Sequence, residues 1–244
     1  MKNVIIIIPS YNESKSLPTV INGIRNELPG ARMIFVDDSN VKENEKIKKI
    51  VKQFKNIDLI SRGKKMGRGS AVVEGLKYGL KYKEALYFFE MDSDLAHDPK
   101  QLIRFIDKAK EGKVSLVIGS RYMQGGKIVN VILFRRILSR IINLFLHIML
   151  GFKLTDYTDG FRLYRRDAVE FIAKTKIKSS GFITLSELAY KLHRKGFKIA
   201  EVPVTIYRRK HGTSTMGIGL LTTSLIFIFR MKIEEELLNN FKFR

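Results

Sequence analysis

The sequence predicts an α/β fold in which a mostly parallel sheet is flanked by helices. Short apolar runs alternate, along the first half of the chain, with longer segments of helical periodicity. Strand–helix–strand repeats of this kind favour parallel strands joined by right-handed crossovers. The chain has 244 residues, 45% of them hydrophobic, which is enough for one sizeable core.

Each predicted element rests on a local pattern. The first run, VIIII, is apolar at every position, which is typical of a strand buried on both faces. Similar short runs complete the strands expected in the first half, at 4–8, 32–36, 57–61, 85–91 and 114–120. Apolar spacing predicts a helix over 17–28, and a lysine-rich stretch another over 43–54. Pro99, behind a cap at Asp98, is typical of the first turn of a further helix.

The second half of the chain departs from this alternation. Residues 131–150 predict a long helix that is both apolar and basic, and residues 156–168 indicate a loop. Residues 182–195 predict another helix. The segment FKIAEVPVTIYRRKHG, residues 197–212, predicts one or two strands, in which Pro203 favours a position at the sheet edge.

We expect one domain over residues 1–217 and an amphipathic helix over 218–244. The apolar run at 4–8 is too short for the core of a signal peptide. The most apolar stretch, 131–150, is interrupted by Arg135, Arg136 and Arg140, so we expect no membrane span. The protein is therefore expected to lie on a membrane without crossing it, or to pack these stretches into its core or an oligomer interface.

The charge balance favours an anionic partner. Lys and Arg total 45 against 24 Asp and Glu, a formal net charge of +21. Nucleic acid, a phosphorylated substrate and an acidic membrane surface all fit this excess. Cys is absent, which fits a reducing compartment and excludes disulfides and thiolate metal sites.

Polar residues follow three of the predicted strands at the points where these strands end. They are the segment Pro9 to Glu13, the pair Asp37 and Asp38, and the segment Asp92 to Asp94. Ligands of open parallel sheets bind beyond the carboxyl ends of the strands. The sequence therefore predicts one site assembled from separate segments.

The acidic pair Asp92 and Asp94 points to one side of an extended chain. Two such carboxylates repel each other unless a cation lies between them, and hard oxygen ligands suit Mg²⁺ or Mn²⁺ together with substrate phosphates. The alternative is a solvated, Asp-rich turn that begins the next helix. The motif alone leaves both interpretations open.

Eight segments, taken in order, resemble a known family. They are IIPSYNE, FVDDS, GKKMGRGSAVVEGLKYG, MDSDLAHDP, IGSRYMQGGK, RRILSRIIN, DGFRLYRR and RKGFKIAEVPVTIYRRKHGTSTM. In this order they resemble the GT-A fold glycosyltransferases of family 2, specifically the dolichyl-phosphate mannose synthase group and its polyprenyl-phosphate relatives. The resemblance covers most of residues 4–216.

The resemblance implies a role for each segment. Asp92 and Asp94 would bind Mg²⁺ or Mn²⁺ on the diphosphate of a nucleotide sugar, with Ser93 beside them through its backbone. Five further residues would hold the nucleotide: Pro9, Tyr11 and Glu13 in its pocket, and Asp38 with Val36 at base and ribose. Arg121, Arg135 and Arg209 would neutralise phosphate charge, and Ser139 would lie near the acceptor phosphate.

The family implies an inverting, metal-dependent transfer of a hexose to dolichyl or polyprenyl phosphate. Mannose from GDP-mannose is the first expectation, and the enzyme is expected to be peripheral, on the cytoplasmic face of a membrane. Ala96, the TDGF segment and the HGTST segment depart from the mannose synthase pattern. A UDP-sugar such as UDP-glucose, or a soluble acceptor, therefore stays open.

Two interpretations from other classes compete with this one. A nucleic-acid-binding protein fits the charge, but the basic residues are scattered, and no platform of aromatic residues interleaved with arginine is evident. We therefore expect no nucleic-acid partner. A catalytically inactive, transferase-like subunit is the other alternative, and the intact acidic pair argues against it.

Overall fold

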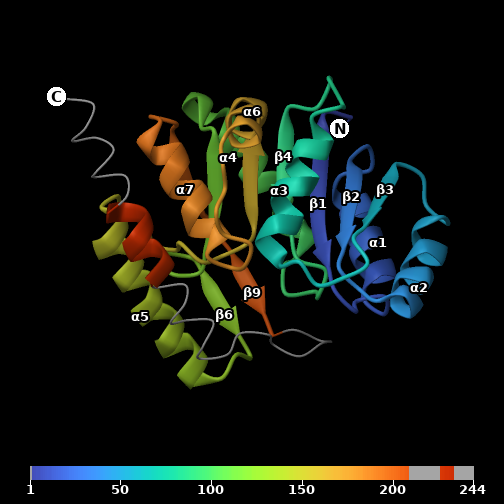
Figure 1. Ribbon diagram of the computed structural model, residues 1–244, viewed down its shortest axis with the longest axis horizontal. Coiled ribbons are helices and arrows are strands. Elements are labelled where there is room, and N and C mark those ends of the chain that lie inside the picture. Colours follow the sequence, from blue (N-terminus) through green and yellow to red (C-terminus); the bar gives the residue numbers. More distant parts are fainter. Residues whose placement is uncertain (1, 209–225, 234–244) are drawn as a thin grey trace.

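The computed structural model describes residues 2–208 and 226–233 (Figure 1). Seven strands form the central sheet in the order β3-β2-β1-β4-β7-β5-β8, and β6 and β9 form a second, small sheet. The strands are β1 Val4–Ser10, β2 Arg32–Asp37, β3 Ile57–Ser61, β4 Tyr87–Glu90, β5 Leu116–Ser120, β6 Lys127–Val129, β7 Arg162–Arg165, β8 Ile199–Pro203 and β9 Thr205–Tyr207. The α-helices are α1 Leu17–Glu27, α2 Val41–Val51, α3 Arg68–Gly79, α4 Leu102–Lys110, α5 Leu133–Leu150, α6 Arg166–Lys174 and α7 Thr184–Arg194.

The central sheet is parallel except for β7. Strand β1 lies between β2 and β4 and pairs with both in parallel, and β5 pairs in parallel with β8. Strand β7 runs antiparallel to β4 and to β5. The register aligns Ser10 with Asp37, so the carboxyl ends of β1 and β2 are level. The polar residues that follow these strands therefore meet at one edge of the sheet.

Helices cover both faces of the sheet. Buried apolar residues of α1, α2 and α4 pack on one face, and those of α3, α5, α6 and α7 pack on the other. The five residues from Val4 to Ile8 are at most 1% exposed, because β1 is covered on both faces. This arrangement explains why the VIIII run carries no polar position.

The mixed α/β fold with a largely parallel sheet is confirmed, and most elements lie within a few residues of their predicted bounds. Asp98 caps the short 3₁₀ helix at Pro99–Gln101 by accepting a hydrogen bond from the Lys100 amide. Pro203 ends β8, the strand at one edge of the sheet, as expected. Of the helix expected over 218–244, the structure describes residues 226–233 as helical, and the rest lies outside the described residues.

The loop predicted over 156–168 is wrong in its second half. Strand β7 and the start of α6 occupy that region. Arg162 begins β7 and is fully buried, and its guanidinium donates to the backbone carbonyls of Tyr157, Asp159 and Leu185. Because a charged residue occupies a fully buried position of this strand, hydrophobicity alone does not predict the strand.

The small β6–β9 sheet brings a late segment of the chain beside the acidic segment. The Tyr207 amide donates to the Ala96 carbonyl at 3.0 Å, and His97 forms an isolated bridge with Ile206. The Arg208 amide donates to the Val129 carbonyl. Residues from both halves of the chain therefore meet at the acidic edge of the sheet.

Helix α5 presents an apolar stripe to solvent. Asn143, Leu146 and Leu150 are buried, whereas the opposite side carries six exposed apolar residues, each at least 49% exposed: Leu133, Phe134, Ile137, Ile141, Leu144 and Ile148. Figure 1 shows α5 at the periphery of the molecule, far from β1, β2 and β3. In the described part of the chain, none of the helices combines the length and the apolar character that crossing a membrane requires.

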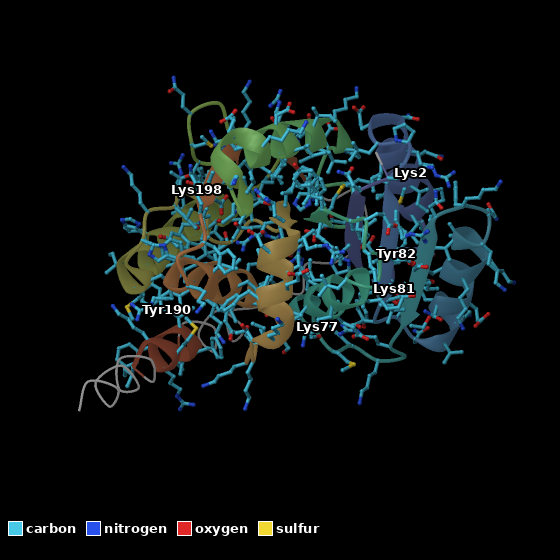
Figure 2. The ribbon with its side chains drawn as sticks, turned by 90° about the horizontal axis from the view of Figure 1, so that it is seen from above. Lys2, Lys77, Lys81, Tyr82, Tyr190 and Lys198 are labelled. Atoms are coloured by element: carbon cyan, nitrogen blue, oxygen red, sulfur yellow. The ribbon has the colours of Figure 1, made fainter. Side chains whose placement is uncertain are left out.

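Cationic side chains extend from many parts of the surface. Figure 2 shows Lys198 on the far side of the molecule from Lys2, and Lys77 and Lys81 near the α3 helix. Lys81 lies over the ring of Tyr78, with its Nζ 3.5 Å from the ring centroid. The basic residues of the described chain are therefore spread over the surface, as the sequence indicates.

Candidate functional site

The predicted site residues meet at the carboxyl edge of β1, β2 and β4. The Asp38 amide donates to the Ser10 carbonyl at 2.9 Å, and Ser93 Oγ donates to the Pro9 carbonyl at 3.1 Å. These two bonds tie the segments after β1, β2 and β4 to one another. The structure thus brings Pro9, Asp38, Ser93 and the acidic pair together.

Asp92 is held by an arginine that the sequence did not indicate. Arg68 Nε and Nη2 both donate to Asp92 Oδ1, at 2.8 and 2.6 Å. Arg68 Nη1 donates to Glu90 Oε1 at 2.5 Å, and Tyr164 donates its hydroxyl to the other oxygen of Glu90 at 3.0 Å. Burial lowers the pKa of Arg68, but Asp92 and Glu90 outweigh burial and raise it, so the guanidinium stays charged.

Asp94 closes a tight turn beside Asp92. Its Oδ1 accepts the Ala96 amide at 2.9 Å, and Leu95 between them adopts a left-handed backbone with φ of 66°. The Asp94 residue is 3% exposed. Asp94 therefore forms the turn that the second interpretation expects, although it is buried and not solvated, and the metal role of the acidic pair stays a prediction.

His97 joins the acidic segment to the loop that precedes β7. Its Nδ1 accepts the Asp92 amide at 3.0 Å, and its Nε2 lies 3.5 Å from Asp159 Oδ1. Burial lowers the pKa of His97, whereas Asp92 and Asp159 raise it and outweigh burial. A proton on Nδ1 would nevertheless point at the N–H of Asp92. The hydrogen bond from the Asp92 amide therefore selects the neutral ring, with its proton on Nε2. The ring stacks on Phe161 with centroids 4.8 Å apart, and His97 therefore positions Asp92.

Arg121 is engaged by two buried carboxylates. Its Nε and Nη2 donate to the two oxygens of Asp156 at 2.6 and 2.8 Å, and its Nε lies 3.4 Å from Asp159. Burial would raise the pKa of Asp159, but the hydrogen bond with His97 and the charge of Arg121 lower it. A continuous chain of polar contacts therefore runs from Arg68 through Asp92, His97 and Asp159 to Arg121.

The segment after β2 is tied to the glycine-containing loop. Asp38 Oδ2 accepts the amides of Met66 and Gly67 at 2.8 and 3.0 Å, and Asp38 Oδ1 accepts from Arg62 Nε at 2.5 Å. Gly67 has φ of 103° and its missing Cβ leaves room for the Ser180 carbonyl, so other residues do not fit this turn. Asp38 therefore shapes the loop that leads into α3.

The remaining residues predicted for the nucleotide differ in exposure. Tyr11 is 42% exposed, with Lys65 Nζ 4.8 Å from its ring centroid. Glu13 is mostly buried and accepts from Ser16 Oγ. Val36 is fully buried, and its side chain belongs to the core beside α3. The roles of all three toward a nucleotide stay predictions.

Helix α5 carries two of the residues predicted to meet the acceptor. Asn143 Nδ2 donates to the Ser139 carbonyl and to Thr158 Oγ1, and Thr158 Oγ1 also accepts from Arg121. Ser139 lies one turn before Asn143 on the half-buried side of the helix, whereas Arg135 is exposed. Arg209 lies outside the described residues.

The acidic edge fits a divalent cation that shares its ligands with a substrate. The charged groups gathered at this edge are five carboxylates (Glu90, Asp92, Asp94, Asp156 and Asp159) and three guanidinium groups (Arg68, Arg121 and Arg162), an excess of two negative charges when His97 is counted as neutral. Within residues 2–208 and 226–233, no group of three or more His, Cys, Asp or Glu side chains is placed to hold a metal. A Mg²⁺ or Mn²⁺ site built on one or two carboxylates plus phosphate oxygens has this composition.

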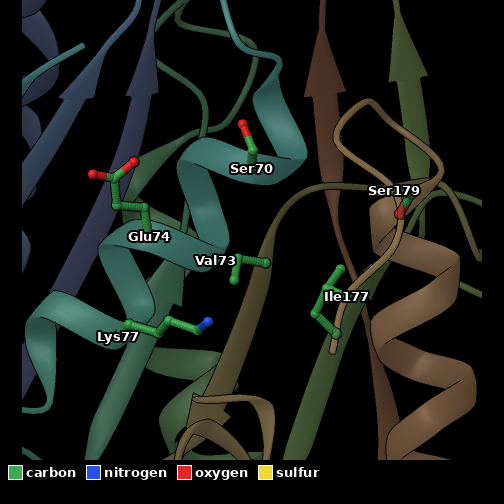
Figure 3. Close-up of a pocket in the computed structure, with 6 residues that line it drawn as sticks. All are labelled: Ser70, Val73, Glu74, Lys77, Ile177 and Ser179. Atoms are coloured by element: carbon green, nitrogen blue, oxygen red, sulfur yellow. The ribbon is translucent and has the colours of Figure 1, made fainter. Parts of the chain in front are cut away.

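A pocket of about 300 Å³ lies beside the glycine-containing loop (Figure 3). Its lining comes from the outer side of α3 and from the segment before α7: Ser70, Val73, Glu74, Lys77, Ile177 and Ser179. Ser70 Oγ accepts from Arg62 Nη1 at 2.8 Å, which connects the pocket wall to Asp38. None of the residues predicted for the site lines this pocket.

Sequence reasoning missed Arg68, Glu90 and Asp159. Arg68 begins α3, in a stretch that the sequence identified only as basic, and Glu90 ends an apolar strand run. The buried position of Glu90 is the signal that was available, because a carboxylate inside an apolar run needs a cationic partner.

Comparisons with known proteins point to one family. The model of the family described as glycosyl transferase family 2 matches residues 5–172. The chain is similar to an undecaprenyl-phosphate mannosyltransferase from Micrococcus luteus, with 33% identity over 228 residues that cover 93% of each protein. It is also similar to a polyprenol monophosphomannose synthase from Mycolicibacterium smegmatis, with 31% identity over 87% of this chain and 80% of that protein.

Solved structures show the same fold at lower identity. Glucosyl-3-phosphoglycerate synthase from Mycobacterium tuberculosis, crystallised with Mn²⁺, uridine-diphosphate-glucose and glycerol 3-phosphate, gives a TM-score of 0.63 at 16% identity, over 93% of this chain and 78% of that one. Its complex with uridine-diphosphate gives 0.64 at 17% identity, over 96% and 79% of the two chains. Because the family model spans more than half of the sequence and both relatives exceed 30% identity over most of it, the chain belongs to glycosyl transferase family 2 and is a glycosyltransferase.

Proposed function

We propose that this glycosyltransferase transfers mannose from GDP-mannose to dolichyl or another polyprenyl phosphate, with inversion at the anomeric carbon. The observation that carries the proposal is the acidic pair at the carboxyl edge of β4, connected by Asp159 and Arg121 to the apolar and basic helix α5. The names of the two relatives support the sugar and the class of acceptor.

The reaction requires no proton transfer by the protein. A phosphate oxygen of the acceptor, anionic at pH 7, forms a bond to the anomeric carbon as the bond from that carbon to the nucleoside diphosphate breaks. The electron pair leaves with the diphosphate, so an α-linked donor gives a β-linked lipid phosphate. His97 is consistent with this scheme, because it is buried and its Nδ1 already accepts the Asp92 amide.

Asp92 and Asp94 would hold Mg²⁺ or Mn²⁺, which stabilises negative charge on the departing diphosphate when bound. Arg68 orients the Asp92 carboxylate, His97 holds the Asp92 backbone by accepting its amide, and the Ala96 amide orients the Asp94 carboxylate. Tyr11, Glu13 and Asp38 would line the nucleotide pocket, together with Pro9, Val36 and the Ser93 backbone.

Arginines would neutralise the phosphates on the acceptor side. Asp156 holds the Arg121 guanidinium, and Arg135 and Ser139 lie on α5 within three turns of Asn143, which supports this part of the proposal. Arg209 would join them from the segment that follows β9. Asp156 and Asp159 already balance the charge of Arg121. In this proposal Arg121 therefore binds the acceptor phosphate through directional hydrogen bonds more than through net charge.

The exposed stripe of α5 would lie in the headgroup region of an anionic membrane. Its apolar residues face solvent on one side, and Arg135, Arg136 and Arg140 are exposed on the same helix. Ile226 and Phe229 of the 226–233 helix are also exposed, while Ile228 and Met231 pack in the same core cluster as Leu146 and Leu150. An amphipathic helix with a basic rim binds an anionic surface in this way, and the lack of cysteine fits the cytoplasmic side.

The double variant Phe134→Ser/Ile141→Ser is expected to lower binding to vesicles of anionic phospholipid about tenfold or more, because each change removes an apolar side chain from the docking face. Vesicle flotation measures the bound fraction. Val41→Ser is the matched control, because Val41 is 73% exposed on α2, on the opposite side of the sheet from α5. Unchanged flotation of the double variant would assign the stripe to contact between protein copies, which sedimentation without lipid would detect.

Transfer itself is tested with a panel of radiolabelled nucleotide sugars, a short polyprenyl phosphate, and Mg²⁺ or Mn²⁺. We expect label from GDP-mannose to enter the organic phase, with at least about tenfold preference over UDP-glucose, since a wrong base leaves buried polar groups unpaired. Preference for UDP-glucose would assign the alternative donor. Label that stays in the aqueous phase on a soluble acceptor would overturn the lipid assignment.

A further inference from the structure

Arg68 occupies a slot that the surrounding chain leaves for it. The missing side chain of Gly160 makes room for the guanidinium, because a Cβ there would lie 2.1 Å from Arg68 Nη2. The ring of Phe182 covers another side, with Arg68 Cζ 5.7 Å from the ring centroid. The side chain of Arg68 is 12% exposed, so its contacts are shielded from water.

The slot places a fixed positive charge directly behind one of the carboxylates proposed to hold the metal. Two N–H groups of Arg68 point at the same oxygen of Asp92, and a third points at Glu90, which is fully buried. Glu90 anchors the guanidinium in turn, since Tyr164 holds its second oxygen. The arrangement relieves the repulsion between the carboxylates without any ion from solution.

We propose that Arg68 is a positioning residue that makes binding of the divalent ion depend on the nucleoside diphosphate. This inference rests on the proposed function, in which Asp92 and Asp94 hold the ion. The guanidinium charge opposes a free cation that approaches Asp92. A nucleoside diphosphate brings negative charge to the ion and offsets that opposition, so ion and donor bind together.

The charges of this cluster predict opposite effects for two variants. Glu90→Gln removes a negative charge and leaves Arg68 uncompensated except by Asp92, so it is expected to weaken binding of free Mn²⁺ about tenfold. Arg68→Met combined with Glu90→Gln removes the charge nearest Asp92 while the total charge stays the same, so it is expected to strengthen binding of free Mn²⁺ about tenfold. A purely structural role predicts no such opposition, because damage to the fold weakens binding in both variants.

The experiment measures free Mn²⁺ by electron paramagnetic resonance during titration of the full chain, alone and with saturating GDP or UDP. In the wild-type protein we expect nucleotide to tighten Mn²⁺ binding by about tenfold or more, and we expect this coupling to shrink in the double variant. Arg166→Met/Glu170→Gln is the matched control, since it removes another arginine–glutamate pair, one that contacts the opposite end of β4. Circular dichroism melts confirm that each variant is folded, and Glu90→Gln alone, which keeps shape and volume, still tests the sign if the double variant does not fold.

The possible outcomes distinguish failure of the proposed role of Arg68 from failure of the proposed metal site. Wild-type protein that binds no Mn²⁺ even with nucleotide would overturn the metal site itself. Wild-type protein that binds Mn²⁺, with variants that are unchanged or that shift in the same direction, would overturn only the role of Arg68.

Discussion

Asp94→Asn is expected to lower kcat for sugar transfer by at least about 100-fold, because it removes a charge and a hard ligand where the diphosphate charge develops. The fold should survive the change, since the amide oxygen of asparagine can still accept the Ala96 amide and close the turn. Transfer of label to the organic phase measures the rate, and Mn²⁺ binding in the presence of nucleotide should be lost in parallel.

Asp98→Asn is the matched control for this variant. It makes the same chemical change four residues away, at a cap position where asparagine serves as well as aspartate. We expect its turnover to be within about twofold of wild type. Near-normal turnover of Asp94→Asn would remove the ion from the mechanism, whatever the behaviour of Asp98→Asn.

Asp156→Asn is expected to lower the free energy of unfolding by about 3–5 kcal/mol, because it leaves the buried charge of Arg121 poorly compensated. The Asp156 carboxylate is fully buried and accepts from the Arg121 side chain and from the amides of residues 121, 158 and 159. An asparagine side chain presents its NH₂ group to at least one of these donors. Urea denaturation measures the change, and transfer should fall as well because Arg121 loses its orientation.

The control for Asp156→Asn is an arginine–carboxylate pair at the surface. Glu170 lies 3.4 Å from Arg166 on α6, and its side chain is 50% exposed. Glu170→Gln should change the free energy of unfolding by no more than about 0.5 kcal/mol, because exposed pairs are screened by water. Equal effects of the two substitutions would mean that the Asp156 cluster is well hydrated in solution.

Hydrophobic periodicity predicted the parallel sheet because both faces of β1, β2 and β4 are covered by helices. A run such as VIIII, apolar at every position, is typical of a strand that is covered on both faces. Strand β7 escaped this reasoning, since Arg162 is buried through hydrogen bonds to three carbonyls and not through apolar character. The sequence also did not predict that the α5 stripe is exposed, because an apolar pattern identifies a face of the helix but not what covers that face.

The acidic pair could be located from the sequence because it follows a strand, and strand ends of a parallel sheet converge. Its partners could not, since Arg68 and Asp92 are 24 positions apart and Arg121 and Asp156 are 35 apart. Such pairs are set by how loops from different elements approach one another. The roles predicted for Tyr11, Glu13, Val36, Ser139 and Arg209 stay predictions that await a bound donor.

Because β7 is antiparallel to its neighbours, two separate stretches of the chain contribute residues to the candidate site. Because β7 runs against its neighbours, the loop that enters it arrives at the edge where β4 and β5 end, and it delivers Asp156, Thr158 and Asp159 there. In the proposed function, the residues expected to hold the nucleotide precede residue 98, whereas those expected to meet the acceptor follow residue 120. If these roles hold, substitutions in the later stretch would change the choice of acceptor while the earlier stretch continues to bind the nucleotide.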